Sequence, residues 1–263
     1  CHNFLAYNFG GVRPDGTSGL SAAGAQLGAN FFGQSSLATH ALARASDVVK
    51  LPPGTPLELV GPLGCGVQTG AGAVMNSLDV RAGTAIVIAG AGAVGLSAVM
   101  AAAVRNAATI IAVDLHENRR ALARELGATH TIDPTAGPLS EQVREIIPAG
   151  ADYAVDNSAV TPVVEQLLAS LGMKGALGLI GVPADPEATF SMGLLAAPLY
   201  GLTVRGIVEG DSVPQTFIPY LLDLYLQGKF PFDKLITTMP LAEIDKAIAG
   251  MHSGEILKAV LIP

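Results

Sequence analysis

A glycine turn set inside a long apolar run is the feature that most constrains this fold. Residues 85–104 (AIVIAGAGAVGLSAVMAAAV) carry no charge, and the turn GAGAVG occupies positions 90–95. The β-rich residues before the turn favour a buried strand, and the alanine-rich residues after it favour a buried helix. The run also has the length of a membrane-spanning helix. Its glycines argue against that alternative and for a strand, a tight turn and a helix.

The turn matches the pattern G-x-G-x-x-G at Gly90, Gly92 and Gly95. In that setting the first glycine permits the tight turn, the second lets a pyrophosphate approach the backbone, and the third lets helix and strand pack closely. Unpaired amides and the positive end of the helix dipole would hold the phosphates. A turn that serves only packing is the alternative.

An acidic residue follows at the expected distance. Asp114 ends the apolar run 109–113 and lies 19 residues after Gly95. A carboxylate there accepts hydrogen bonds from both ribose hydroxyls and repels a phosphate on the 2′ oxygen, which favours NAD over NADP. Arg119 and Arg120 soften that preference because an arginine can pair with such a phosphate. Their alternative role is that of solvated charges on a surface helix.

Beyond the turn, short β-rich runs alternate with helical patterns. Strands alternating with crossover helices predict a parallel sheet with helices on both faces, an α/β fold of the doubly wound Rossmann type. Gly127 is expected just past the end of a helix that begins near residue 117. The expected strands are 85–89, 109–113, 129–132, 152–155, 176–181 and 202–208, and the expected helices are 93–105, 117–127, 139–147 and 161–171.

The flanking segments differ from this alternation. Residues 1–60 run through glycine-rich loops and a predicted strand pair around 31–43, and they end in the Pro/Gly cluster LPPGTP at 51–56, a boundary signal. After about 208 come two helical patterns and a closing strand, LKAVLIP. We therefore expect a central dinucleotide-type domain between two pieces of another domain.

Composition excludes several classes of protein. Half of the 263 residues are hydrophobic, 14% are charged and the net charge is −7. These values exclude disorder, and the absence of a Lys/Arg-rich run argues against nucleic-acid binding. Two cysteines in a chain of this size indicate thiols or metal ligands in a reducing compartment, and we expect a cytoplasmic protein that does not bind membranes.

One of the two cysteines lies in a notable context. Cys65 stands in GCGVQTGAG, directly before a glycine-studded helix. It is either a small buried thiol or a zinc thiolate, and one cysteine alone does not make a metal site. The five histidines show no metal-binding spacing.

Together these motifs resemble the zinc-dependent medium-chain dehydrogenase/reductase family of the alcohol dehydrogenase type, across essentially the whole chain. The resemblance implies that Cys65 is a ligand of a catalytic zinc and that Thr69 packs on the nicotinamide. It implies cofactor contacts at Gly90, Gly92, Val94, Gly95, Asp114, Arg119, Val182, Ile207, Glu209 and Lys258. Glu209 and Ile207 would serve through their backbone, at the carboxamide.

The resemblance also implies a domain division. Residues 1–66 and 208–263 would belong to a GroES-like, mainly-β catalytic domain, and residues 67–207 would form the NAD-binding domain. Cys1 would be the fourth cysteine of a structural-zinc lobe, with the modified first cysteine of a lipoprotein as the alternative. The chain is then expected to be N-terminally incomplete, with the other zinc ligands and the proton relay ahead of Cys1.

The function implied is NAD- and zinc-dependent oxidation of a primary alcohol to the aldehyde. Segments 31–40 and 205–214 look most like the aryl-alcohol (benzyl alcohol) branch, which indicates an aromatic substrate. Family precedent implies a homodimer or homotetramer, with 194–208 at the interface. Two alternatives stay open: a zinc-free quinone or enoyl reductase, and an NAD-binding fragment that is inactive alone.

Overall fold

The structure is a computed structural model that describes residues 3–33, 40, 43 and 45–263. The chain divides into two compact units, Cys1–Lys50 with Pro263, and Leu51–Ile262. The division falls next to the Pro/Gly cluster that the sequence marks as a boundary. Residues 51–262 form one unit, so the finer division at 66 and 207 stays a prediction.

The described part of the first unit is small and irregular. It contains helix α1 (Phe4–Phe9) and the antiparallel two-residue strands β1 (Ser21–Ala22) and β2 (Ala25–Gln26). Its apolar contacts are edge-to-face pairs of phenylalanine rings with centroids 4.7 to 6.3 Å apart. The aromatic pairs join α1 to a short turn further along the chain.

The strand pair predicted around 31–43 is wrong where the structure describes it. Phe31–Gly33 form a 3-10 turn, and Phe32 has a φ of +52°. A left-handed residue interrupts an extended strand, and the Phe31 and Phe32 rings pack on each other at 4.7 Å instead of pointing to opposite faces. Residues 34–39 and 41–42 of that prediction lie outside the described part of the chain.

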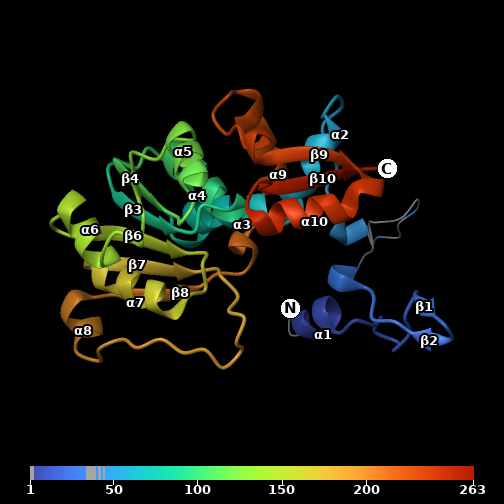
Figure 1. The fold of residues 1–263 in the computed structure, drawn as a ribbon, viewed down its shortest axis with the longest axis horizontal. Coiled ribbons are helices and arrows are strands. Elements are labelled where there is room, and N and C mark those ends of the chain that lie inside the picture. Colours follow the sequence, from blue (N-terminus) through green and yellow to red (C-terminus); the bar gives the residue numbers. More distant parts are fainter. Residues whose placement is uncertain (1–2, 34–39, 41–42, 44) are drawn as a thin grey trace. The chain divides into compact units, whose positions relative to one another are not determined.

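The second unit contains the predicted parallel sheet. Six strands lie in the order β5-β4-β3-β6-β7-β8, and every neighbouring pair is parallel. This confirms the Rossmann-type doubly wound fold predicted from the alternation of strands and helices (Figure 1). The strands are β3 (Ala85–Ala89), β4 (Thr109–Val113), β5 (His130–Ile132), β6 (Ala151–Asp156), β7 (Leu171–Leu179) and β8 (Thr203–Gly206).

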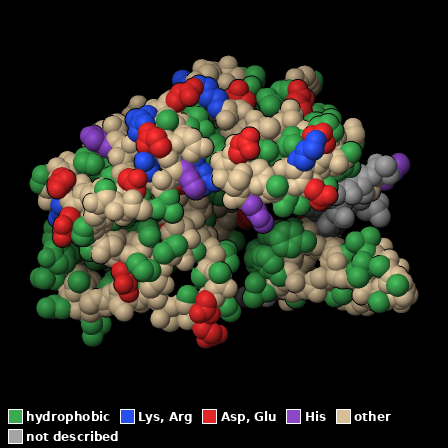
Figure 2. Space-filling model, viewed as in Figure 1, with side chains coloured by type: hydrophobic (Ala, Val, Ile, Leu, Met, Phe, Trp, Pro, Cys, Tyr) green, Lys and Arg blue, Asp and Glu red, His purple; other side chains and the backbone are tan. Residues whose placement is uncertain are grey.

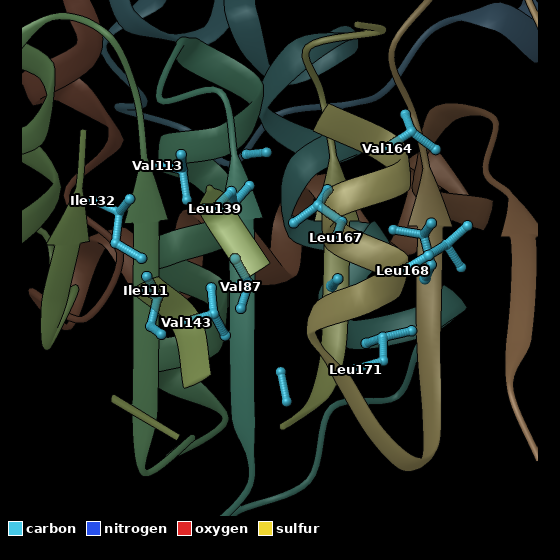
Figure 3. Packing of buried hydrophobic residues seen from close by; sticks show 14 residues of the cluster. Val87, Ile111, Val113, Ile132, Leu139, Val143, Val164, Leu167, Leu168 and Leu171 are labelled. Atoms are coloured by element: carbon cyan, nitrogen blue, oxygen red, sulfur yellow. The ribbon is translucent and has the colours of Figure 1, made fainter. Parts of the chain in front are cut away.

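Helices cover both faces of this sheet. Figure 3 shows side chains from α6 (Leu139–Ile146) and α7 (Thr161–Ser170) against the strands on one face. On the other face α4 (Ala93–Val104) packs on β3, since a Cβ at Gly95 would lie 3.6 Å from the Ile88 side chain. Helix α5 (Glu117–Glu125) follows β4, and Gly127 just beyond it has a φ of +114°, as the sequence predicts.

The core between the sheet and its α6–α7 face is apolar and closed. Alternate residues of a strand point to opposite faces, so β3 contributes Val87 and Ala89 to this layer while Ile86 and Ile88 serve the other. The buried residues of this layer are Val87, Ala89, Ile111, Val113, Ile132, Leu139, Val143, Ala151, Ala154, Val164, Leu167, Leu168, Leu171 and Leu177 (Figure 3). This apolar layer packs α6 and α7 on the sheet.

The remaining elements of the second unit lie outside this sheet. They include α2 (Leu57–Val60), α3 (Gly66–Gly72), α8 (Ala196–Tyr200), α9 (Pro214–Leu226) and α10 (Ile244–Ser253). Strands β9 (Ile236–Pro240) and β10 (Lys258–Ile262) form a parallel pair with Lys258 opposite Ile236. Among the described residues, the mainly-β character expected of the flanking segments is limited to this pair and to β1–β2. Each pair is a separate two-stranded sheet.

Among the described residues no helix has the length and apolarity needed to cross a membrane. The uncharged run 85–104 is divided between β3, the glycine turn and the twelve-residue helix α4. On the face drawn in Figure 2, basic and acidic side chains are interspersed.

Substituting Gly95 with alanine should destabilise the fold strongly. The added Cβ would lie 1.7 Å from the Gly90 carbonyl oxygen, so the turn or the helix must move. We expect the free energy of unfolding in denaturant to fall by about 3 kcal/mol. Gly92→Ala is the matched control, because nothing lies within 4 Å of its Cβ position and its φ is −79°. Equal stability of the two variants would contradict the packing role of Gly95.

Candidate functional site

The glycine turn between β3 and α4 leaves an open space at its centre. Gly90 adopts a φ of +90°, and Gly95 lies directly against the Gly90 carbonyl, so both are required by the backbone. Gly92 is different, because a Cβ there would meet nothing within 4 Å. It is also the N-terminal cap of α4, and no side chain caps that helix. Open space at the start of a buried helix, where amides lack intrahelical partners, fits the diphosphate of a dinucleotide.

Asp114 lies beside this turn, as predicted. The residue is 8% exposed; Oδ2 accepts a hydrogen bond of 2.8 Å from the Ala91 amide, and Oδ1 accepts one of 2.9 Å from the His116 amide. The two bonds fix a carboxylate at the carboxyl end of β4 against the glycine turn. The Arg119 Nη1 atom lies 3.8 Å from Oδ2, and the buried Arg119 Nε has no hydrogen-bond partner among the described residues.

Arg120 has a structural role instead. Its Nη1 donates to the carbonyl oxygens of Asp114 and Leu115 at 2.6 and 3.0 Å, and it also pairs with Glu117 and Asp133. These contacts occupy the guanidinium. Of the two arginines that the sequence places near a 2′ phosphate, only Arg119 keeps an unpaired donor in the described structure.

The loops that follow the strands meet at one edge of the sheet. The Gly90 amide donates to Val113, the Asn157 amide to Ala89, and the Ile207 amide to Leu179, at 2.8 to 3.0 Å. Strand order reverses between β3 and β6, and the crevice at such a point binds the ligands of open α/β sheets. Val182, in the loop after β7, is 89% exposed, whereas Ile207 is buried.

Helix α3 brings Cys65 and Thr69 close to the glycine turn between β3 and α4. A Cβ at Gly70 would lie 1.9 Å from the Val94 carbonyl oxygen, and one at Gly66 would lie 3.4 Å from the Val94 Cγ2 atom. The two glycines therefore allow α3 to pack directly on the first turn of α4. Cys65 precedes α3 and is exposed, so its interpretation as a buried thiol is wrong.

The carboxylate of Glu209, which follows the edge strand β8, contacts these residues. Glu209 Oε2 accepts hydrogen bonds from Gln68 Nε2 at 3.1 Å and from the Thr69 hydroxyl at 3.3 Å, and Oε1 lies 3.8 Å from the Cys65 Sγ atom. The sequence indicated only the backbone of Glu209. It did not indicate Gln68. The signal that could have found this residue is a polar side chain within an apolar helical segment, and the structure shows that it is 3% exposed.

The thiol of Cys65 is less acidic than an ordinary cysteine. Neighbouring atoms that keep water from part of this exposed residue's thiol raise its pKa above the usual 9.0, and the negative charge of Glu209 raises the pKa further. Lys258, at the start of β10, acts in the opposite direction and lowers the pKa. The expectation that Lys258 contacts the pyrophosphate stays a prediction.

The described residues do not fit a complete zinc site. Structural sites take four ligands and catalytic sites take three from the protein. No group of three His, Cys, Asp or Glu side chains suited to a metal occurs in the described part of the chain. Cys65 supplies one thiol, and Cys1, the predicted ligand of a structural zinc, lies outside the described residues.

Comparison with known proteins places these motifs in a family. A family model described as zinc-binding dehydrogenase matches residues 93–227. Geraniol dehydrogenase of Castellaniella defragrans is 43% identical over all of this chain, which covers 70% of that protein.

Solved structures show the same fold. An alcohol dehydrogenase zinc-binding domain protein from Burkholderia ambifaria is 49% identical with a TM-score of 0.95, and the match covers all of this chain and 72% of that one. Benzyl alcohol dehydrogenase from Acinetobacter calcoaceticus is 39% identical with a TM-score of 0.92, over all of this chain and 71% of that one.

Removing the charge of Glu209 should make the Cys65 thiol more reactive. In Glu209→Gln the thiol pKa falls, so more thiolate is present near pH 8, and alkylation of the Cys65 peptide by iodoacetamide should accelerate about two- to threefold. Peptide mass mapping separates Cys65 from Cys1. The control is Glu187→Gln, an exposed glutamate on another loop. An unchanged rate in Glu209→Gln would contradict the electrostatic coupling.

Proposed function

This chain belongs to the zinc-binding dehydrogenase family of medium-chain dehydrogenases, and from that premise we propose that it binds NAD and serves the oxidation of a primary alcohol to its aldehyde. Relatives named for geraniol and for benzyl alcohol support an alcohol substrate. Benzyl alcohol dehydrogenase matches the whole chain, which supports an aromatic alcohol. The substrate is then a small neutral molecule.

One observation carries the cofactor assignment: an open Gly92 next to a buried Asp114 held on the glycine turn. The amides at the start of α4 would hold the diphosphate, and the Asp114 carboxylate would accept hydrogen bonds from the adenosine ribose. Arg119 would lie beside that ribose. The carboxylate favours NAD because it repels a 2′ phosphate.

The remaining candidate residues lie at the reacting end. When bound, the dinucleotide supplies the hydride acceptor. Thr69 would pack on the nicotinamide, with Val94 beside it, and the backbone at Val182 and Ile207 would orient its carboxamide. Holding the ring in one orientation brings the carbinol carbon to one face. The alcohol loses a hydride from that carbon and a proton from its hydroxyl, which gives the aldehyde.

Zinc is a separate question, because the described residues supply no complete site. We keep Cys65 as a candidate ligand without deriving a step through the metal. The same observation favours a second candidate function for residues 1–263 taken alone, namely NAD binding without alcohol turnover. Metal analysis and alcohol-dependent NAD reduction, measured on the same sample, distinguish the two candidates.

Asparagine at position 114 should weaken discrimination between the two cofactors. Asp114→Asn keeps an oxygen that can accept from the Ala91 amide but removes the charge that repels a 2′ phosphate. We expect the ratio of the NADP to NAD dissociation constants, measured by calorimetry, to fall about tenfold. Gly92→Ala should weaken both cofactors alike, because its methyl group fills the diphosphate space. An unchanged ratio in Asp114→Asn would refute the ribose assignment.

We further propose that the chain forms a homodimer or homotetramer through residues 194–208. Strand β8 is an edge of the sheet, and Leu194 and Leu195 are 91% and 74% exposed. An exposed edge beside apolar side chains is a surface that pairing with a second copy would bury.

A charge placed on this surface should separate the subunits. Leu195→Asp puts an unpaired carboxylate into the proposed interface, and we expect light scattering after gel filtration to show a monomer. Leu226→Asp is the matched control, because Leu226 is also 74% exposed but lies on α9. An oligomer that survives Leu195→Asp, or dissociates equally in both variants, would place the interface elsewhere.

A further inference from the structure

The strand order assigns the two nucleotides of the proposed cofactor to the two halves of the sheet, which meet between β3 and β6. Asp114 follows β4, and the open Gly92 follows β3, next to the point where the order reverses toward β6. A dinucleotide whose diphosphate lies at that point and whose adenosine lies over β4 extends its second nucleotide over β6, β7 and β8.

Glu209 follows β8, in the half of the sheet over which the second nucleotide would lie. Its carboxylate crosses to α3, where Oε2 accepts from Gln68 and Thr69 at 3.1 and 3.3 Å. Helix α3 itself packs on the first turn of α4 through the contact between Gly70 and the Val94 carbonyl. The carboxylate is thus fixed beside the path of the second nucleotide.

The backbone holds Glu209 in a conformation that is unfavourable for glutamate. Glu209, Gly210 and Asp211 all have a positive φ, of 51°, 65° and 48°. Close contact with α3 maintains the segment, since a Cβ at Gly210 would lie 2.7 Å from both the Gln68 carbonyl oxygen and the Gly72 Cα atom. Left-handed non-glycine residues persist where the surrounding structure imposes them, and they cluster at functional sites.

The charge of Glu209 is not neutralised by an ion pair within the described residues. Its hydrogen-bond partners are an amide, a hydroxyl and a thiol, and no Lys or Arg of the described chain lies within 4.0 Å of it. The charge of Lys258 acts on the neighbouring Cys65 thiol, but Lys258 forms no ion pair with Glu209. Asp211, two residues later, differs: its Oδ2 accepts from the Arg205 guanidinium and from the Ser77 hydroxyl, both at 2.8 Å.

We infer that Glu209 selects the oxidation state of the cofactor. The oxidised nicotinamide carries a positive charge and the reduced ring is neutral, so a carboxylate that forms no ion pair, on the second-nucleotide side, stabilises bound NAD⁺ relative to bound NADH. It thereby favours loading of the hydride acceptor and release of NADH after alcohol oxidation. This inference rests on the proposed NAD function.

The test compares the dissociation constants of NAD⁺ and NADH, measured by calorimetry on the full chain. Glutamine at position 209 keeps an acceptor for Gln68 and Thr69 but removes the charge. In Glu209→Gln we expect NAD⁺ binding to weaken about fivefold while NADH binding changes less than about twofold. Glu209→Asp, which keeps the charge, should retain most of the preference. Asp211→Asn, which removes a charge already paired with Arg205, should leave the ratio of the two constants unchanged.

Equal weakening of both forms in Glu209→Gln would overturn the inference and leave a purely positioning role. Failure of the wild-type chain to bind either form would overturn the proposed function, and the inference with it. For a glutamine variant that did not fold, the wild-type ratio at low and high ionic strength tests the same charge. A preference for NAD⁺ that weakens with salt supports the inference, and one independent of salt overturns it.

Discussion

The contact between Gly95 and the Gly90 carbonyl is the constraint on which the rest of this structure depends. It brings the first turn of α4 against the end of β3 so closely that a Cβ would lie 1.7 Å from the carbonyl oxygen. The close approach puts the start of α4 next to the carboxyl end of β4, where Asp114 can reach the Ala91 amide. The turn that leaves open space at Gly92 thus requires a glycine at position 90 for its φ of +90° and a glycine at position 95 for the close contact.

A second set of glycines extends this arrangement to the reacting end. Gly70 lies against Val94, and Gly72 lies against Gly210, so α3 is in close contact with both the turn and the segment after β8. Backbone contacts of this kind leave little room for adjustment, because backbone atoms cannot rotate away as side-chain ends do. The positions of Cys65 and Thr69 are therefore set by packing that begins at the cofactor turn.

Much of the fold, and one half of the candidate site, was predictable from local sequence. Strands β3 and β4 are continuous apolar runs, and the glycine pattern with an acid 19 residues later depends on spacing that is visible in the chain. The contact of Glu209 with residues 65–69 joins segments about 140 positions apart. It depends on a left-handed turn, which propensity does not reveal in a glutamate. The exposed thiol was missed for a related reason, since cysteine is usually buried and only the packing of α3 shows otherwise.

Asp114, Asp156 and Glu209 each lie at or shortly after the carboxyl end of a strand, and they differ in their partners. Asp156 accepts hydrogen bonds from the Ser158 amide and hydroxyl and from the Ala159 amide, which ties it to its own loop. Asp114 accepts from two amides and lies near Arg119, so its charge is partly balanced where a ribose would bind. Glu209 has only neutral partners among the described residues, and they lie on another element. A carboxylate in a local ion pair stabilises the fold, whereas one without an ion pair can act on a ligand that binds next to it. On the nicotinamide side, a bound ring is charged in only one of its two oxidation states.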